Sequence, residues 1–256
     1  MIRRNVLKLA SAGLLASSDS LDAMNLPVND TFPTQPPDLV REVVTVAHFN
    51  LKRLQELVDE RPSLARAAWD WGFGDWETAL GAASHMGNRP IAEYLLSKGA
   101  RPSLFSAAML GQLEVVKAFV AAQPHVQRTR GPHGIPLLAH ARAGGEAART
   151  VFDFLHSLGD AGAEPPVPLT DSDIASVAGS YPFGSGTNDQ IDVTADKGYL
   201  TWTRKGAVGR PLHHLGERVF YPAGASEVRI RFGDEDGVVV MTIHDPGLVL
   251  TAKRKS

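Results

Sequence analysis

The sequence contains no cysteine. Disulfide bonds, thiolate zinc sites, iron–sulfur clusters and cysteine nucleophiles are therefore excluded together. The chain also lacks an excess of basic residues, because its net charge is −2. That balance gives no reason to expect nucleic acid or an anionic membrane as a partner. With 256 residues, of which 43% are hydrophobic, the chain has room for two ordinary soluble domains.

The common catalytic motifs are missing as well. The sequence has no Ser-x-x-Lys, no Gly-x-Ser-x-Gly and no His-Glu-x-x-His. Its glycine-rich pieces do not stand between a strand and a helix, as a nucleotide site requires. Residues 184–186 (Gly-Ser-Gly) read as a turn, and the acidic run 234–237 lacks the trailing glutamate of a calcium loop. We therefore predict no catalytic residue, no metal site and no cofactor.

The N-terminus has the layout of an export signal. Arg3 and Arg4 precede a short apolar run, and with Leu7-Lys8 they resemble a twin-arginine signal. The apolar run is far shorter than the ~20 residues of a membrane-spanning helix, so we expect no stable membrane insertion after cleavage. We predict an export signal over residues 1–23, a linker over 24–38 and a periplasmic or otherwise exported protein, or a cytoplasmic one if the signal is not functional.

Residues 78–101 contain a helix of small residues, a Gly-Asn turn, a second helix with an apolar stripe and a Gly-Ala exit. The positions that carry this pattern are Thr78, Leu80, Ala82, Ala83, Gly87, Ile91, Ala92, Leu95, Leu96, Gly99 and Ala100. The segment resembles an ankyrin repeat, whose nominal length is 33 residues. About four copies align over residues 39–160, and their anchor positions Asn50, Gly87, Gly111 and Gly144 are spaced by 37, 24 and 33 residues. The resemblance implies an ankyrin-repeat α-solenoid.

After a Pro-rich linker (161–170), hydrophobic residues recur with a period of two, which indicates strands. The strand-like runs are 191–193, 199–203, 219–221, 228–232, 238–243 and 248–250. We therefore predict a small antiparallel β-barrel over residues 171–256, and an α+β multidomain fold for the chain. Segments 177–181, 198–202, 219–220 and 230–232 resemble the lipocalin-like β-domain at the C-terminus of serine β-lactamase/esterase-like proteins, where it is an accessory to a catalytic domain.

The long first spacing of the helical repeats contains a tryptophan-rich insertion, residues 69–77. Rigid aromatic faces beside carboxylates are suited to sugar rings, peptides or cations. Alternatively, the insertion folds back and its tryptophans cover the helical stack. We predict binding residues here and on the neighbouring repeats: Trp69, Asp70, Trp71, Phe73, Asp75, Trp76, His85, His133, His140 and Arg142.

Three functional hypotheses follow. The leading one is non-enzymatic recognition of another protein or a small ligand by the concave face and the tryptophan-rich insertion. The second is an enzyme or enzyme accessory with a polar site between the domains, built from His133, His140 and the carboxylates of the insertion. The third is a small apolar ligand held in the β-barrel. His213 and His214 are adjacent in a strand, so their side chains point to opposite faces and cannot bind one ion together.

Overall fold

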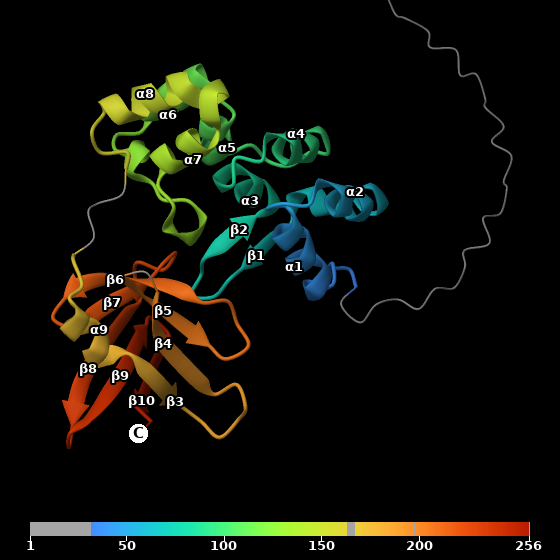
Figure 1. Ribbon diagram of the computed structural model, residues 1–256. Helices are drawn as coiled ribbons and strands as arrows, with labels where there is room; N and C mark the ends of the chain where they lie inside the picture. Colours follow the sequence, from blue (N-terminus) through green and yellow to red (C-terminus); the bar gives the residue numbers. More distant parts are fainter. Residues whose placement is uncertain (1–31, 163–166, 197, 256) are drawn as a thin grey trace, which may run out of the picture. The chain divides into compact units, whose positions relative to one another are not determined.

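The computed structural model describes residues 32–162, 167–196 and 198–255 (Figure 1). The predicted export signal and parts of both predicted linkers lie outside the described residues. Within those ranges, no helix has the length and apolar character needed to cross a membrane.

Helices α1 to α8 follow one another along the chain as four pairs (Figure 1). The pairs are α1 (Pro37–Val46) with α2 (Leu51–Glu60), α3 (Ala79–His85) with α4 (Arg89–Ser97), α5 (Leu104–Met109) with α6 (Leu113–Ala122), and α7 (Leu137–Ala143) with α8 (Arg149–Ser157). Short 3-10 helices are η1 (Pro62–Arg66), η2 (Val126–Arg128), η3 (Pro132–Gly134) and η4 (Gly145–Ala148). The predicted helical character of this half of the chain is confirmed.

Local chemistry sets where these helices begin and how closely they approach. The side chains of Asn50, Thr78 and Asn88 each accept a hydrogen bond from the first turn of α2, α3 and α4, which satisfies an otherwise unpaired N–H. Gly87 and Gly111 have positive φ angles at the turns inside the second and third pairs. A Cβ at either position would also collide with a backbone carbonyl of the fourth pair. Glycine is therefore required there both for conformation and for close packing.

The tryptophan-rich insertion is a β-hairpin. Strands β1 (Ala68–Asp70) and β2 (Trp76–Thr78) pair antiparallel, with Trp69 opposite Glu77. The turn between them uses three consecutive positive φ angles, at Gly72, Phe73 and Gly74. Along β2 the side chains alternate, so Trp76 and Thr78 face outward while Glu77 is fully buried.

The second half of the chain forms a nearly closed antiparallel barrel. Its strands are β3 (Gly179–Pro182), β4 (Gln190–Asp196), β5 (Tyr199–Arg204), β6 (Arg210–Gly216), β7 (Val219–Pro222), β8 (Arg229–Glu235), β9 (Val238–Asp245) and β10 (Leu248–Lys253). Each strand pairs with its neighbour in sequence, from β3 to β10. The two ends of the sheet approach each other, because the N–H of Lys255 donates to the carbonyl of Ser180 at 2.8 Å. The predicted β-barrel is confirmed, with β3 and β6 added to the predicted runs.

Aromatic residues fill the interior of the barrel. Tyr181 and Phe220 are fully buried and both pack against Phe232 at ring distances of 5.6 and 5.7 Å. The short helix α9 (Asp171–Val177) adds Val177, whose carbonyl accepts a hydrogen bond from the Tyr181 hydroxyl. These side chains belong to the hydrophobic core of the barrel.

Candidate metal centre

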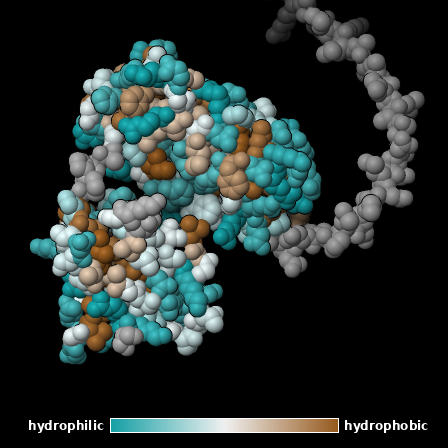
Figure 2. Space-filling model, viewed as in Figure 1, coloured by the Kyte–Doolittle hydropathy of each residue, from teal (hydrophilic) through white to brown (hydrophobic). Residues whose placement is uncertain are grey.

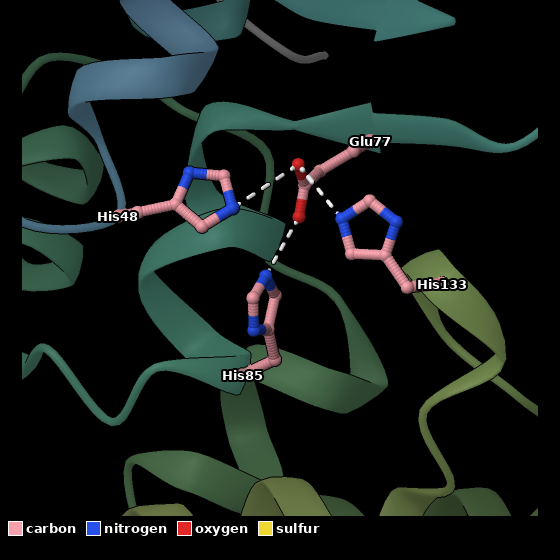
Figure 3. A group of neighbouring side chains, drawn as sticks. All are labelled: His48, Glu77, His85 and His133. Carbon is pink, nitrogen blue, oxygen red and sulfur yellow. Dashed lines mark hydrogen bonds and ion pairs between the residues drawn. The ribbon is translucent and has the colours of Figure 1, made fainter. Parts of the chain in front are cut away.

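Four side chains from separate elements converge on one point (Figure 3). His48 lies in the turn after α1, and His85 is the last residue of α3. His133 belongs to η3, and Glu77 comes from the inward side of strand β2. Each side chain offers one ligand atom, and all four atoms lie within 4.8 Å of one another. The hairpin and the helical pairs together therefore assemble a three-histidine, one-carboxylate cluster.

The distances around Glu77 suit a metal ion. The Nε2 atoms of His48, His85 and His133 lie 3.5, 2.9 and 3.4 Å from the nearest carboxylate oxygen of Glu77. Tetrahedral ligands at about 2.0–2.1 Å from a zinc ion are separated from one another by roughly 3.3 Å. The nitrogen-to-oxygen separations in the cluster bracket that value.

Two of the three imidazoles present the correct nitrogen. Nδ1 of His48 is 3.0 Å from the carbonyl oxygens of Val44 and Thr45, which can only accept, so Nδ1 carries the proton. Nδ1 of His133 likewise faces Asp75 Oδ2 at 2.8 Å. In both rings Nε2 is therefore the atom left to bind a metal. Anchoring the distal N–H to an oxygen is how proteins fix a metal-binding histidine.

Asp75 holds His133 in place. Its carboxylate accepts both the backbone N–H and the Nδ1–H of His133, each at 2.8 Å. His133 has a φ of 59°, a left-handed conformation that a residue with a side chain adopts only when its surroundings enforce it. Arg210 of strand β6 is 3.2 Å from the same carboxylate, and a Cβ on Gly224 would collide with it. The barrel thus holds Asp75 in place, and Asp75 in turn orients His133.

The cluster is strongly polarised. Burial alone would raise the pKa of Glu77, but hydrogen bonds from His133 and His85 outweigh it and lower this pKa to about 2. Burial alone would lower the pKa of His133, but hydrogen bonds to Asp75 and Glu77 raise it to about 9. Without an ion, the Glu77 carboxylate is negatively charged at neutral pH and the His133 ring is a positively charged imidazolium. A metal cation would take the place of that proton.

The same network also satisfies a buried carboxylate without an ion. Glu77 accepts from Trp71 Nε1–H at 2.7 Å as well as from His85. A buried carboxylate needs such partners whatever else it does. A hydrogen-bonded network around a buried carboxylate is therefore the alternative to a metal site, and titration with metal distinguishes the two.

His140 lies next to the cluster but is not part of it. Its side chain is fully buried, 6.3 Å from the ring of His85, and neither ring nitrogen has a hydrogen-bond partner among the described residues. Burial, reinforced by the charge of His85, lowers its pKa to about 4 against the opposing effect of Glu77. His140 is therefore a neutral imidazole packed against Phe105.

A cavity of about 460 Å³ adjoins the cluster through Trp71 and His133. Trp69 and Phe73 of the hairpin also line it, and Phe73 packs on Trp202 of the barrel at a ring distance of 5.5 Å. The hairpin thus contributes side chains both to the histidine cluster and to the cavity.

The predicted binding residues divide into several groups. His85 and His133 enter the cluster, Asp75 supports it, and Trp69, Trp71 and Phe73 line the cavity. Trp76 is 64% exposed on the outer side of β2. Asp70 accepts the backbone N–H of Gly72 and so stabilises the hairpin turn. Arg142 lies over the ring of Phe152, where it lines a different, shallow pocket.

Sequence reasoning missed His48 and did not select Glu77. A signal for His48 was present, because it stands two residues before the anchor Asn50, as His85 stands two residues before the anchor Gly87. Equivalent positions of stacked repeats lie side by side. Glu77 could have been found from the alternation of its strand, which places it opposite in direction to Trp76.

Comparison of the sequence with models of protein families and with curated proteins finds no match.

Proposed function

We propose that this protein binds a divalent first-row transition metal ion through His48, Glu77, His85 and His133. The observation that carries the proposal is the convergence of three imidazole nitrogens on one fully buried carboxylate. Three neutral nitrogen ligands and one oxygen ligand suit zinc and its neighbours better than calcium or magnesium, which prefer all-oxygen sites. This proposal replaces the expectation of no metal and no cofactor.

The test is titration of the metal-free full-length protein with Zn²⁺ by calorimetry, and with Co²⁺ by visible absorption. We expect one ion per chain and a Co²⁺ spectrum typical of nitrogen and oxygen ligands. His85→Gln should weaken Zn²⁺ binding more than about 100-fold, since loss of even a supporting residue costs 10–100-fold. His244→Gln is the matched control, because His244 is exposed on β9.

Equal affinity of the wild type and His85→Gln, or no binding by a folded wild type, would refute the proposal. The cluster would then be a hydrogen-bonded network that stabilises a buried carboxylate. Bound metal should also raise the unfolding free energy, by about 2.7 kcal/mol when free metal is 100 times its dissociation constant.

We further propose that residues 39–160 are an ankyrin-repeat stack, that the barrel is of the lipocalin-like type and that the protein is exported. Four consecutive helix pairs and glycines at the predicted turns support the first point. The absence of cysteine is compatible with an oxidising compartment. Detection of a cleaved N-terminus in a periplasmic extract would test the export signal, and Lys substituted for Arg3 and Arg4 should abolish export.

Recognition of a partner remains a second candidate function, and the exposure of Trp76 favours it. An exposed tryptophan is unusual for a residue of its size. On the face drawn in Figure 2, hydrophobic residues lie in small groups among hydrophilic ones. A pull-down with wild-type protein and Trp76→Ala from an extract of the native organism tests this function, and a partner retained equally by both would exclude a role for Trp76.

A further inference from the structure

The cavity beside the histidine cluster has walls from four parts of the chain, one of which is His133 of η3. Arg41 comes from α1, Trp69, Trp71 and Phe73 come from the hairpin, and the segment 202–210 of strands β5 and β6 and their connecting loop closes the other side. Its volume, about 460 Å³, is within the range of small-molecule sites. It is therefore large enough for a ligand of two or three fused or linked rings.

The charge of the lining has one sign. The ionisable side chains that line the cavity are Arg41, Arg204, Arg210 and His133, and no carboxylate lines it in the part of the chain that the structure describes. Arg204 and Arg210 are partly compensated from outside the lining by Asp189 and Asp75. Arg41 has no ion pair among the described residues, whereas His133 contacts Asp75 and Glu77, both of which lie outside the lining. A ligand placed here meets net positive charge.

Four aromatic side chains also line the cavity. Trp69 and Trp71 are only half-buried, so part of each indole faces the cavity. Phe73 and Trp202 meet at an angle of 57° and form a second aromatic surface. Large aromatic faces with free area favour flat apolar groups. Arginine adds planar donors that recognise carboxylate, sulfonate or phosphate groups in two-pronged fashion.

We propose that this cavity is a binding site for a small organic anion, with a flat aromatic body held against Trp69 and Trp71 and an acidic group paired with Arg41. The site is separate from the metal centre in its chemistry, because none of its proposed contacts uses a metal ligand. It gives the protein a second function, the recognition of an aromatic acid.

Two fluorescent dyes that differ by one sulfonate group test the proposal: 1-anilinonaphthalene-8-sulfonate and its neutral counterpart N-phenyl-1-naphthylamine. Both are titrated into the full-length protein in the presence of EDTA, so that the outcome is independent of metal binding. We expect the anionic dye to bind at one site, with an affinity at least about tenfold higher than that of the neutral dye, as charged hydrogen bonds allow. Energy transfer from tryptophan to the bound dye locates it near the indoles.

Three variants make the test specific. Arg41→Gln should remove most of the preference for the anionic dye, whereas Arg149→Gln, on the exposed surface of α8, should leave it unchanged. Ala207→Trp, which fills the cavity from an exposed position of its rim, should abolish binding of both dyes. Equal affinities for the two dyes, or unaltered binding of the anionic dye by a folded Arg41→Gln or Ala207→Trp protein, would overturn the proposal.

Discussion

The buried imidazole of His140 makes the folded protein sensitive to acid in a defined pH window. Its pKa is about 4 in the folded protein, against 6.5 for an unperturbed histidine. The unfolded chain therefore binds a proton below about pH 6.5 that the folded protein does not accept until about pH 4. The contribution of this group to stability is complete above pH 6.5 and is lost as the pH falls through that window.

The size of the effect follows from the shift. The difference between the two pKa values corresponds to a loss of about 3 kcal/mol of unfolding free energy once the pH is well below both values, since one pKa unit is about 1.4 kcal/mol. His140→Leu preserves most of the volume and removes both unpaired ring nitrogens. We expect this variant to be as stable as the wild type, or more stable, near pH 7.5, because a buried donor or acceptor without a partner costs about 1–3 kcal/mol.

The assay is urea unfolding of wild type and variant with EDTA, at about pH 7.5 and about pH 4.5, followed by circular dichroism. Between these two pH values, the variant should gain about 2–3 kcal/mol on the wild type. Titrating groups that do not interact with His140, including His133, contribute equally to both proteins and cancel in the difference. Parallel pH profiles of wild type and variant would refute the reasoning, since His140 would then be protonated alike in the folded and unfolded states.

Three further predictions concern the surroundings of the cluster. Asp75→Asn should lower the pKa of His133 from about 9, because the variant loses a negative charge that favours the imidazolium. NMR titration of the metal-free protein measures this pKa, and an unchanged value would contradict the contact between Asp75 and His133. Gly224→Ala should destabilise the protein by at least about 1 kcal/mol more than Gly237→Ala. Both glycines have positive φ angles, but only a Cβ at position 224 would collide with Asp75. Equal losses of unfolding free energy in urea would argue against that packing. In single-tryptophan variants, acrylamide should quench Trp76 more than any other tryptophan, and a shielded Trp76 would place strand β2 in the opposite orientation.

The elements of the fold were accessible from the sequence where periodicity is strong. The helical segment and most barrel strands follow from apolar periods of 3.6 and 2, which burial of one face imposes. Strand β6 (Arg210–Gly216) was expected only at His213 and His214, and its full extent was not predicted. These two residues stack on Tyr221 and Phe220 of the next strand. Those stacking partners are defined only once the strands pair.

The cluster could be predicted only in part. His133 and the carboxylates of the insertion were identified as a possible polar site, but His48 lies 85 residues before His133 in the chain. Such long-range convergence depends on how the helical pairs pack, which a local pattern does not encode. The expectation of no metal rested on the absence of short-range ligand motifs, and three histidines from three different elements leave no such motif.

Strand β2 also limits how the insertion could change in evolution. Trp76 and Glu77 are neighbours on opposite faces of one short strand. Inserting one residue between Asp75 and Trp76, or deleting one from the turn at residues 72–74, with β2 still paired to β1, would shift the register by one and exchange the two faces. The carboxylate would then point to water and the indole would point at the histidines. The outward tryptophan and the inward carboxylate therefore depend on the same strand register, so the length of this hairpin is constrained even where its individual turn residues are not.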